Sequence, residues 1–434
     1  MKRIISLFLT ILFSCLYVNA QDSTYAREMI RTLSSDNMYG RGTAHDGDGR
    51  AAAFLVHELS SLKPFGKSFK QPYHYKSFAM EGKVSLSIND KQLSSFNDYQ
   101  IAPFSRTLNQ ECGVIFVDPK LLLNEKKLNA FVEKNREKLS TAFVCLDMTK
   151  WAKKKESERT PIEKAVKELH YSNPFHSLGI LINVSEFPVW SLIRTHYERQ
   201  YALIYLKGYA KFKSIKKIHP SFHNELIDHE TQNVAAYSKG TLYPDSFIVF
   251  TAHYDHLGCM GDSVIFHGAH DNASGCAAVL DIARHFEQHP AKYSVAFILF
   301  SGEETGCLGS QYYVKHPLFP LSKIKCLVNL DLMCGGDEGI TVVNANSPNT
   351  KPYFEKILRI NEHFHAVPIV KARENAKNSD HFPFVDAKVP AFFVYTMGGK
   401  TGPYHHWNDT CENCGLERYE GIVNLFIKMV EVDW

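Results

Sequence analysis

Residues 251–258 read Thr-Ala-His-Tyr-Asp-His-Leu-Gly, and residues 268–275 read Gly-Ala-His-Asp-Asn-Ala-Ser-Gly. The first stretch continues an apolar run, which predicts a buried strand that ends in His253 and Asp255. The second stretch places Asp271 in the loop that follows, before a helical pattern. Imidazoles and carboxylates gathered at one strand end and in the next loop are typical of a metal site.

Polar side chains also follow three later apolar segments. In an open α/β sheet, binding sites form outside the carboxyl ends of the strands, so these side chains are expected to meet the first group. A single histidine after a strand is usually structural, and the prediction therefore rests on the joint set. The segments lead to Glu303 and Glu304 after residues 295–302, to Asp331 after residues 326–330, and to His405 after residues 391–396.

Apolar strands alternate with helical patterns from residue 233 onward, which predicts a largely parallel sheet covered on both faces. The expected fold class is α/β. We expect a three-layer α/β/α domain with a mixed, mostly parallel central sheet, plus an inserted α+β subdomain. The expected parts are a signal peptide at 1–20, the N-terminal part of the main domain at 21–79, the inserted subdomain at 80–225 and the catalytic domain at 226–434.

The pattern from residue 233 onward also predicts individual strands and helices. The expected strands are 233–237, 247–253, 295–301, 326–332, 340–343 and 391–396, and the expected helices are 273–289, 308–315, 353–364 and 416–432.

The N-terminus has the pattern of a secretory signal. Lys2 and Arg3 precede an apolar run that ends in Val18-Asn-Ala20, so cleavage is expected after Ala20. The run is short for a membrane span, and no stable span is expected. We expect an exported protein, periplasmic or secreted; an alternative interpretation makes Cys15 the acylated cysteine of a lipoprotein. The formal net charge of +3 gives no reason to expect a nucleic-acid partner.

The chain has 10 cysteines, and loss of Cys15 with the signal would leave an odd number. Cys411 and Cys414 form a CxxC, which is either a local disulfide or a pair of thiols. Since there is no second CxxC, a structural zinc site is not expected. The remaining cysteines near the motifs are expected as small buried side chains rather than disulfide partners: Cys259, Cys276, Cys307, Cys326 and Cys334.

The candidate ligands are nitrogen and oxygen donors, which suit Zn²⁺ and to a lesser degree Mn²⁺ or Co²⁺. Glu303 is left over beside Glu304, and a free carboxylate beside a metal-bound water is the general base that hydrolysis requires. Asp255 is placed to accept the second ring N–H of His253. A dinuclear site needs one bridging carboxylate and two terminal ligands for each ion, and five candidates match that number: His253, Asp271, Glu304, Asp331 and His405.

These motifs resemble, in their order, those of the co-catalytic two-metal zinc aminopeptidases, a family that also includes glutamate carboxypeptidases and glutaminyl cyclases. The resemblance covers residues 233–434 well, extends to 34–62, and matches 80–220 only by position. It rests on residues 252–258, 268–275, 301–306, 329–333, 379–384 and 404–410.

The resemblance implies a zinc aminopeptidase/phosphorylase-like fold, two Zn²⁺ per chain and peptide substrates. It implies that Asp271 bridges the two ions, that His253 and Asp331 complete one of them, and that Glu304 and His405 complete the other. Glu303 would be the general base. The choice of His405 over His406 rests on the family's ligand, which lies four residues before the aspartate of the closing motif, here Asp409.

Three other functions fit parts of this pattern. A glutaminyl cyclase would use one zinc ion in the same fold, so metal stoichiometry separates it from the peptidase. A non-catalytic binding protein on a peptidase scaffold is expected to have lost ligands or the base, whereas all six positions are filled here. A carboxypeptidase acting on acidic C-termini needs a basic specificity pocket, for which the sequence gives no sign.

Overall fold

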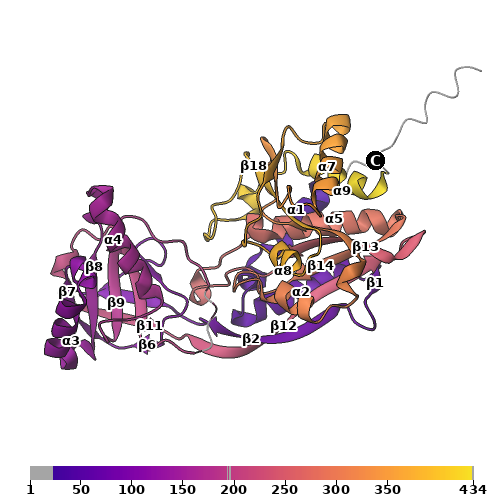
Figure 1. Ribbon diagram of the computed structural model, residues 1–434. Helices are drawn as coiled ribbons and strands as arrows, with labels where there is room; N and C mark the ends of the chain where they lie inside the picture. Colours follow the sequence, from indigo (N-terminus) through magenta and orange to yellow (C-terminus); the bar gives the residue numbers. More distant parts are fainter. Residues whose placement is uncertain (1–22, 193, 195–196, 433–434) are drawn as a thin grey trace, which may run out of the picture.

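The computed structural model describes residues 23–192, 194 and 197–432, and Figure 1 shows two lobes that meet at a narrow waist. The expected signal peptide and Cys15 lie outside the described residues. Each lobe is built on its own β-sheet. Within the described part of the chain, no helix has the length and apolar character that a membrane crossing requires.

The sheet of the larger lobe is mixed, which confirms the α/β class. Its strands run in the order β1-β12-β14-β13-β15-β18-β16-β17, and β2 also pairs with β12. The centre, from β14 to β18, is parallel, whereas β12 and β16 join it in antiparallel fashion. The bounds are β1 (Lys63–Pro64), β2 (Lys70–Ala79), β12 (Glu225–Ser238), β13 (Tyr243–His253), β14 (Tyr293–Phe300), β15 (Ile324–Leu330), β16 (Gly339–Val343), β17 (Val370–Arg373) and β18 (Ala391–Met397).

Helices pack on both faces of this sheet. Alternate residues of β13 show the two faces: Phe250 and Ala252 belong to one buried cluster, and Phe247 and Val249 to another. Both faces of the central strands are therefore apolar, as the near-continuous hydrophobic segments predicted. The first cluster includes α1 (Ser23–Leu33), α2 (Gly47–Glu58), α5 (Ser274–Gln288), α7 (Lys351–Phe364) and α9 (Tyr419–Glu431), and the second includes α6 (Leu308–Lys315) and α8 (His381–Asp386).

Helix α5 fixes the position of the loop that carries Asp271. It begins at Ser274, three residues after Asp271, and most of its length is buried. It ends at Gln288, because His289 precedes Pro290 and a residue before proline is disfavoured in the helical region; His289 takes φ −127° and ψ 72°. The helix packs against β13, β14 and β15, whose ends carry His253, Glu304 and Asp331.

The smaller lobe has a second mixed sheet, in the order β4-β3-β11-β7-β8-β9-β10-β5, with β6 paired to β11. Strands β7 to β10 are parallel, and residues of α3 (Glu125–Leu139) and α4 (Glu156–Lys167) share a buried cluster with them. The strands are β3 (Ser85–Ile88), β4 (Lys91–Gln92), β5 (Tyr99–Ile101), β6 (Leu108–Asn109), β7 (Cys112–Val117), β8 (Ala142–Asp147), β9 (Gly179–Val184), β10 (Ala202–Lys207) and β11 (Lys217–Phe222).

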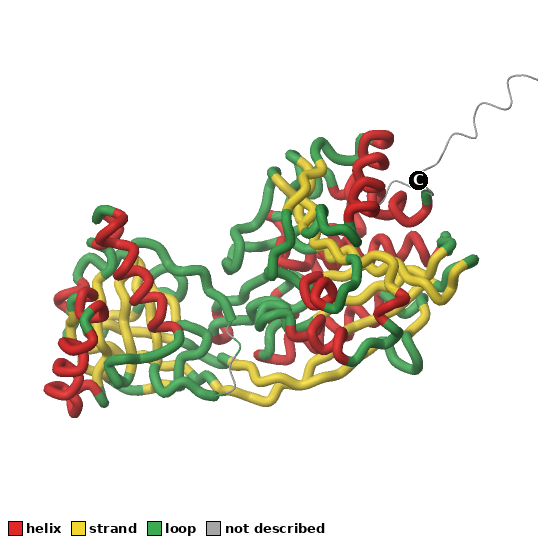
Figure 2. Tube along the Cα trace, in the orientation of Figure 1, coloured by secondary structure: helices red, strands yellow, loops and turns green. Residues whose placement is uncertain are grey.

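Two features join the lobes at the waist. Strands β2 and β12 pair from Glu225 with Ala79 to Val234 with Lys70, and Figure 2 shows this long ribbon along the lower edge of the molecule. In addition, the segment between His253 and Asp271 sends four apolar side chains into a buried cluster of the smaller lobe. These side chains are Leu257, Met260, Val264 and Phe266.

Candidate metal centre

His253 ends strand β13 and lies between two carboxylates. Its Nε2 atom is 3.3 Å from Oδ1 of Asp271 and 3.3 Å from Oδ1 of Asp331. Asp331 directly follows β15, and all three residues are buried. Their donor atoms lie within 4.8 Å of one another, which is close enough for one ion to bind all three.

A second group uses the other oxygen of Asp271. Nε2 of His405 lies 3.3 Å from Oδ2 of Asp271 and 3.1 Å from Oε2 of Glu304. Nδ1 of His256 lies 2.7 Å from Oε1 of Glu304, and His256, Asp271 and Glu304 also have donor atoms within 4.8 Å of one another. The two oxygens of Asp271 thus face different donor groups, as a bridging carboxylate requires.

His256 was not among the site residues predicted from the sequence. The only signal was its place in the same motif, three residues after His253. Its ring is close enough to Glu304 to hold that carboxylate in place or to compete with His405 as a donor.

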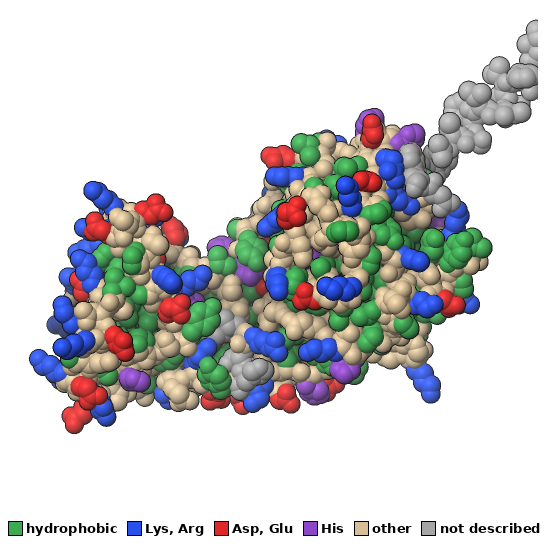
Figure 3. All heavy atoms as spheres, viewed as in Figure 1, with side chains coloured by type: hydrophobic (Ala, Val, Ile, Leu, Met, Phe, Trp, Pro, Cys, Tyr) green, Lys and Arg blue, Asp and Glu red, His purple; other side chains and the backbone are tan. Residues whose placement is uncertain are grey.

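The donor set fits zinc. Imidazole nitrogens and carboxylate oxygens are ordinary zinc ligands. The candidate ligands include no cysteine thiolate, the ligand type that favours softer metals. The Nε2 atoms of His256 and His405 are buried and lack a hydrogen-bond partner among the described residues. Buried polar atoms without a hydrogen-bond partner are uncommon. A cation held by the facing carboxylates would give the Nε2 atom of His405 a partner. Figure 3 shows histidine side chains at the waist, where the two lobes meet.

Glu303 and Glu304 lie in the loop after β14, and Asp255 fixes that loop. The carboxylate of Asp255 accepts the backbone N–H of Glu303 at 3.1 Å and that of Glu304 at 3.2 Å. For His253, the atom that faces Nδ1 at hydrogen-bond distance is the backbone oxygen of Asp255, at 3.1 Å, while its carboxylate is 3.7 Å away. The accepting atom therefore differs from the one expected, and the carboxylate connects the strand ends of β13 and β14.

The two adjacent glutamates have opposite electrostatic environments. Burial, together with repulsion from Glu304 and Asp380, raises the pKa of Glu303 well above its usual range. Burial alone would also raise the pKa of Glu304, but the imidazoles of His405 and His256 lower it to about 2. Two carboxyl groups whose pKa values are pushed apart can take different roles, one as a fixed anion and the other in proton transfer.

The histidines respond to the same carboxylates. Burial would lower the pKa of His253, but Asp331 and Glu303 raise it well above the usual range. Burial would likewise lower the pKa of His405, yet Glu304 and Asp271 raise it to about 10. The site therefore has an excess of negative charge that strongly favours a cation at these imidazoles.

Residues outside the predicted set hold the ligands in place. The carboxylate of Asp409 accepts the backbone N–H groups of His270 and Asp271, at 2.9 and 3.1 Å. Ser379 donates its hydroxyl to Oδ2 of Asp331 at 2.8 Å and accepts from the side chain of Asn329. The motifs around residues 379 and 409 resembled the family, but their sequences do not specify these contacts.

The glycine-rich segment near residue 40 supports the same loops. Arg41 is fully buried, and its guanidinium donates to backbone oxygens of the metal-site segments. A Cβ atom on Gly40 or Gly42 would lie 2.2 or 2.4 Å from backbone atoms of Gly258, so only glycine permits this close approach.

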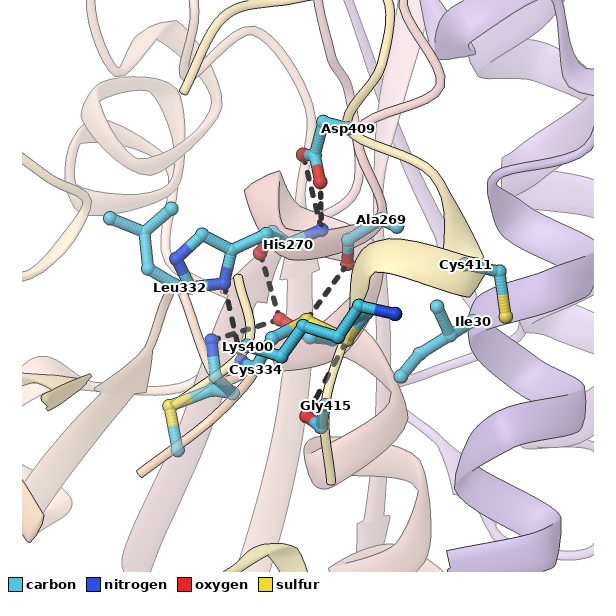
Figure 4. The surroundings of a disulfide bond; sticks show 12 residues. Ile30, Ala269, His270, Leu332, Cys334, Lys400, Asp409, Cys411 and Gly415 are labelled. Carbon is cyan, nitrogen blue, oxygen red and sulfur yellow. Dashed lines mark hydrogen bonds between the residues drawn. A yellow bond between two sulfur atoms is a disulfide. The ribbon is translucent and has the colours of Figure 1, made fainter. Parts of the chain in front are cut away.

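A disulfide joins Cys334 to Cys414, and it corrects the expectation that Cys334 is a simple buried thiol. Cys411, the other member of the CxxC, is free and buried. The two partners are 80 residues apart in sequence, and local spacing cannot indicate such a pair. Figure 4 shows the bond beside Ala269 and His270. The bond connects the loop after Asp331 to the segment after the closing motif.

Residues 233–430 match Peptidase family M28. This domain belongs to peptidase family M28. The M28 domain therefore spans β13, β14, β15 and β18, whose ends carry the metal-centre residues. The family suspected from the motifs is confirmed.

A curated aminopeptidase is similar to this chain in sequence. Aminopeptidase YwaD of Bacillus subtilis (strain 168) is 29% identical over 197 residues, which are 42% of this chain and 40% of that protein. The sequence match thus spans less than half of this curated relative.

The likeness in fold to solved structures covers more of the chain. The structure of BSAP, a zinc aminopeptidase from Bacillus subtilis, has a TM-score of 0.67 at 19% identity and covers 94% of this chain and 95% of that one. A peptidase M28 precursor from Shewanella amazonensis SB2B has a TM-score of 0.63 at 17% identity and covers 96% and 95%. At this identity the likeness shows a shared fold along nearly the whole chain, both lobes included.

Proposed function

We propose that this protein is an exported zinc aminopeptidase that hydrolyses N-terminal peptide bonds at a dinuclear site. One observation carries the proposal: the two oxygens of Asp271 face two separate donor groups, one with His253 and Asp331 and the other with His405 and Glu304. The peptidase family of the domain and the names of its relatives support the same reaction class.

In this proposal the roles of the ligands follow from their positions. Asp271 would bridge the ions, His253 and Asp331 would hold one, and His405 and Glu304 would hold the other. Bound zinc would supply a Lewis acid that lowers the pKa of a coordinated water and polarises the substrate carbonyl. Carboxylates beside each imidazole keep the Nε2 atoms of His253 and His405 directed toward the centre.

Glu303 is the proposed general base. Its environment raises its pKa, whereas that of Glu304 is lowered, so Glu303 is the member of the pair suited to gain and release a proton. It takes the proton of the attacking water and delivers it to the leaving amine. Asp255 holds the backbone of both glutamates, which keeps the base beside the centre.

The test combines metal analysis with a substrate panel. We expect about two zinc ions per chain and release of the N-terminal amino acid from unblocked peptides but not from N-acetylated ones, with activity lost on chelation. N-terminal glutaminyl peptides belong in the panel. Cyclisation of these peptides without hydrolysis, at one zinc per chain, would contradict the proposal and indicate a cyclase instead.

A further inference from the structure

The loop that joins β9 to β10 in the smaller lobe reaches back to the metal centre of the larger lobe. Trp190 in this loop is buried, and its ring stacks on Phe266 with centroids 4.5 Å apart and planes 16° apart. Its Nε1 atom donates to the backbone oxygen of Ile101 at 2.8 Å. Phe266 lies in the segment between His253 and Asp271, so the loop is anchored to the segment that connects two of the site residues.

Trp190 places its neighbour at the site. The hydroxyl oxygen of Ser191 lies 3.1 Å from Nδ1 of His405. The opposite ring nitrogen of His405, Nε2, faces Asp271 and Glu304. Tyr404 stacks on the ring, with centroids 3.8 Å apart, so the imidazole is held on its face by one neighbour and at its edge by another.

This arrangement is the one that a metal-binding histidine requires. Such a histidine binds the ion through one nitrogen and donates the other N–H to a fixed acceptor, which sets the tautomer and the orientation of the ring. If Nε2 binds the ion, Nδ1 must carry the proton, and the Ser191 hydroxyl at 3.1 Å is the group placed to accept it. Among the described residues, Ser191 is the hydrogen-bond partner recorded for that atom.

We propose that the smaller lobe is a working part of the metal centre, because Ser191 is a positioning residue that orients His405 for the second zinc ion. This inference rests on the proposed function, in which His405 is a ligand of that ion. The lobe thereby contributes to the chemistry although its own sheet carries none of the candidate ligands. Loss of the hydroxyl frees the imidazole to rotate or to change tautomer. The affinity for the second zinc ion then falls, and the affinity for the first is unchanged.

The experiment is a zinc titration of the metal-free full-length chain in competition with a chromophoric chelator. Ser191→Ala is expected to lower the affinity for the second zinc ion by about 10- to 100-fold and to leave the affinity for the first ion unchanged. Ser191→Thr keeps the hydroxyl and is expected to retain the wild-type affinity. Ser185→Ala, at an exposed serine of the same loop, is the matched control.

Two further readouts separate positioning from a general structural effect. The thermal midpoint of the metal-free protein is expected to be the same for Ser191→Ala and the wild type. The loss of kcat in Ser191→Ala is expected to be regained with excess zinc, with KM unchanged. An unchanged second affinity in Ser191→Ala, or equal losses in the Ala and Thr variants, would overturn the inference.

His405→Ala distinguishes this inference from the proposal on which it rests. If His405→Ala loses the second ion while Ser191→Ala keeps it, the positioning role alone is wrong. If His405→Ala binds two ions as the wild type does, the ligand assignment itself is wrong.

Discussion

Arg41 donates a hydrogen bond from Nη2 to the backbone oxygen of Asp271 at 3.3 Å, across 230 residues of sequence. The same guanidinium donates to the backbone oxygens of Leu33, Tyr254, His267 and Gly268 at 2.6–2.7 Å. One buried cation therefore joins the end of α1, the residue after His253 and the loop that holds Asp271.

Arg41→Met is expected to destabilise the fold by about 3–5 kcal/mol, because it leaves buried carbonyl oxygens without donors and removes a buried positive charge. Urea unfolding measures the change. Arg50→Met, at an exposed arginine of α2, is the control and should cost little. A loss of less than about 1 kcal/mol in Arg41→Met would show that water replaces the guanidinium without difficulty.

The disulfide is expected to stabilise the closing segment. Replacement of both Cys334 and Cys414 by alanine should reduce the free energy of unfolding by about 2–5 kcal/mol, because the bond closes a long loop in the unfolded chain. Cys411→Ala is the control, since that thiol is free. Peptide mapping without reductant should recover Cys334 linked to Cys414; a Cys411–Cys414 link would contradict the structure.

Stability in acid is expected to depend on a hydrogen bond between α9 and α5. Glu431 lies 2.6 Å from Nε2 of His285 and accepts a hydrogen bond from Lys428 at 2.7 Å. The contact with His285 first, and that with Lys428 second, outweigh partial burial and lower the pKa of Glu431 to about 2 from its usual 4.5. Since the folded-state pKa is the lower one, the stabilisation is complete above pH 4.5 and disappears as the pH falls through about 2.

Glu431→Gln should therefore be less stable than the wild type at neutral pH, and the difference should shrink as the pH falls from 4.5 toward 2. Urea unfolding at several pH values measures it. Glu420→Gln, at an exposed glutamate of the same helix, should show no such trend. A difference between Glu431→Gln and the wild type that stays constant across this range would refute the role of the pair.

His256 and His405 both approach Glu304, and their variants should differ. His256→Ala is expected to weaken the second zinc ion about tenfold by releasing the Glu304 carboxylate, while two ions still bind at saturation. His405→Ala is expected to lose that ion. Zinc content after dialysis measures both. If His256→Ala loses the second ion and His405→Ala only binds it more weakly, His256 is the ligand and His405 is the residue that positions Glu304.

The strands and their ends could be predicted from the sequence. Strand β13 ends at His253 as expected, whereas β15, expected at 326–332, spans Ile324–Leu330 and ends directly before Asp331. This worked because buried parallel strands are near-continuous apolar runs, and the polar residue that ends each run lies at the shared edge of the sheet.

Contacts made by single side chains across the fold could not be predicted. Arg41 is a charged residue in a glycine-rich loop, and its burial depends on carbonyl groups far away in sequence. The partner of Cys414 was likewise hidden by sequence distance. Ser191 lies in the predicted inserted subdomain, for which the sequence indicated no candidate catalytic or metal-binding residue. Its contact with His405 depends on how the lobes pack.

The most direct test of the central claim is the turnover of Glu303→Gln with its zinc content measured on the same sample. We expect zinc binding equal to the wild type and a kcat lower by about 10²- to 10⁴-fold, because the substitution keeps the shape of the side chain and removes its basicity. Glu362→Gln, at an exposed glutamate of α7, should be fully active. A Glu303→Gln protein that carries its full zinc and turns over like the wild type would contradict the account.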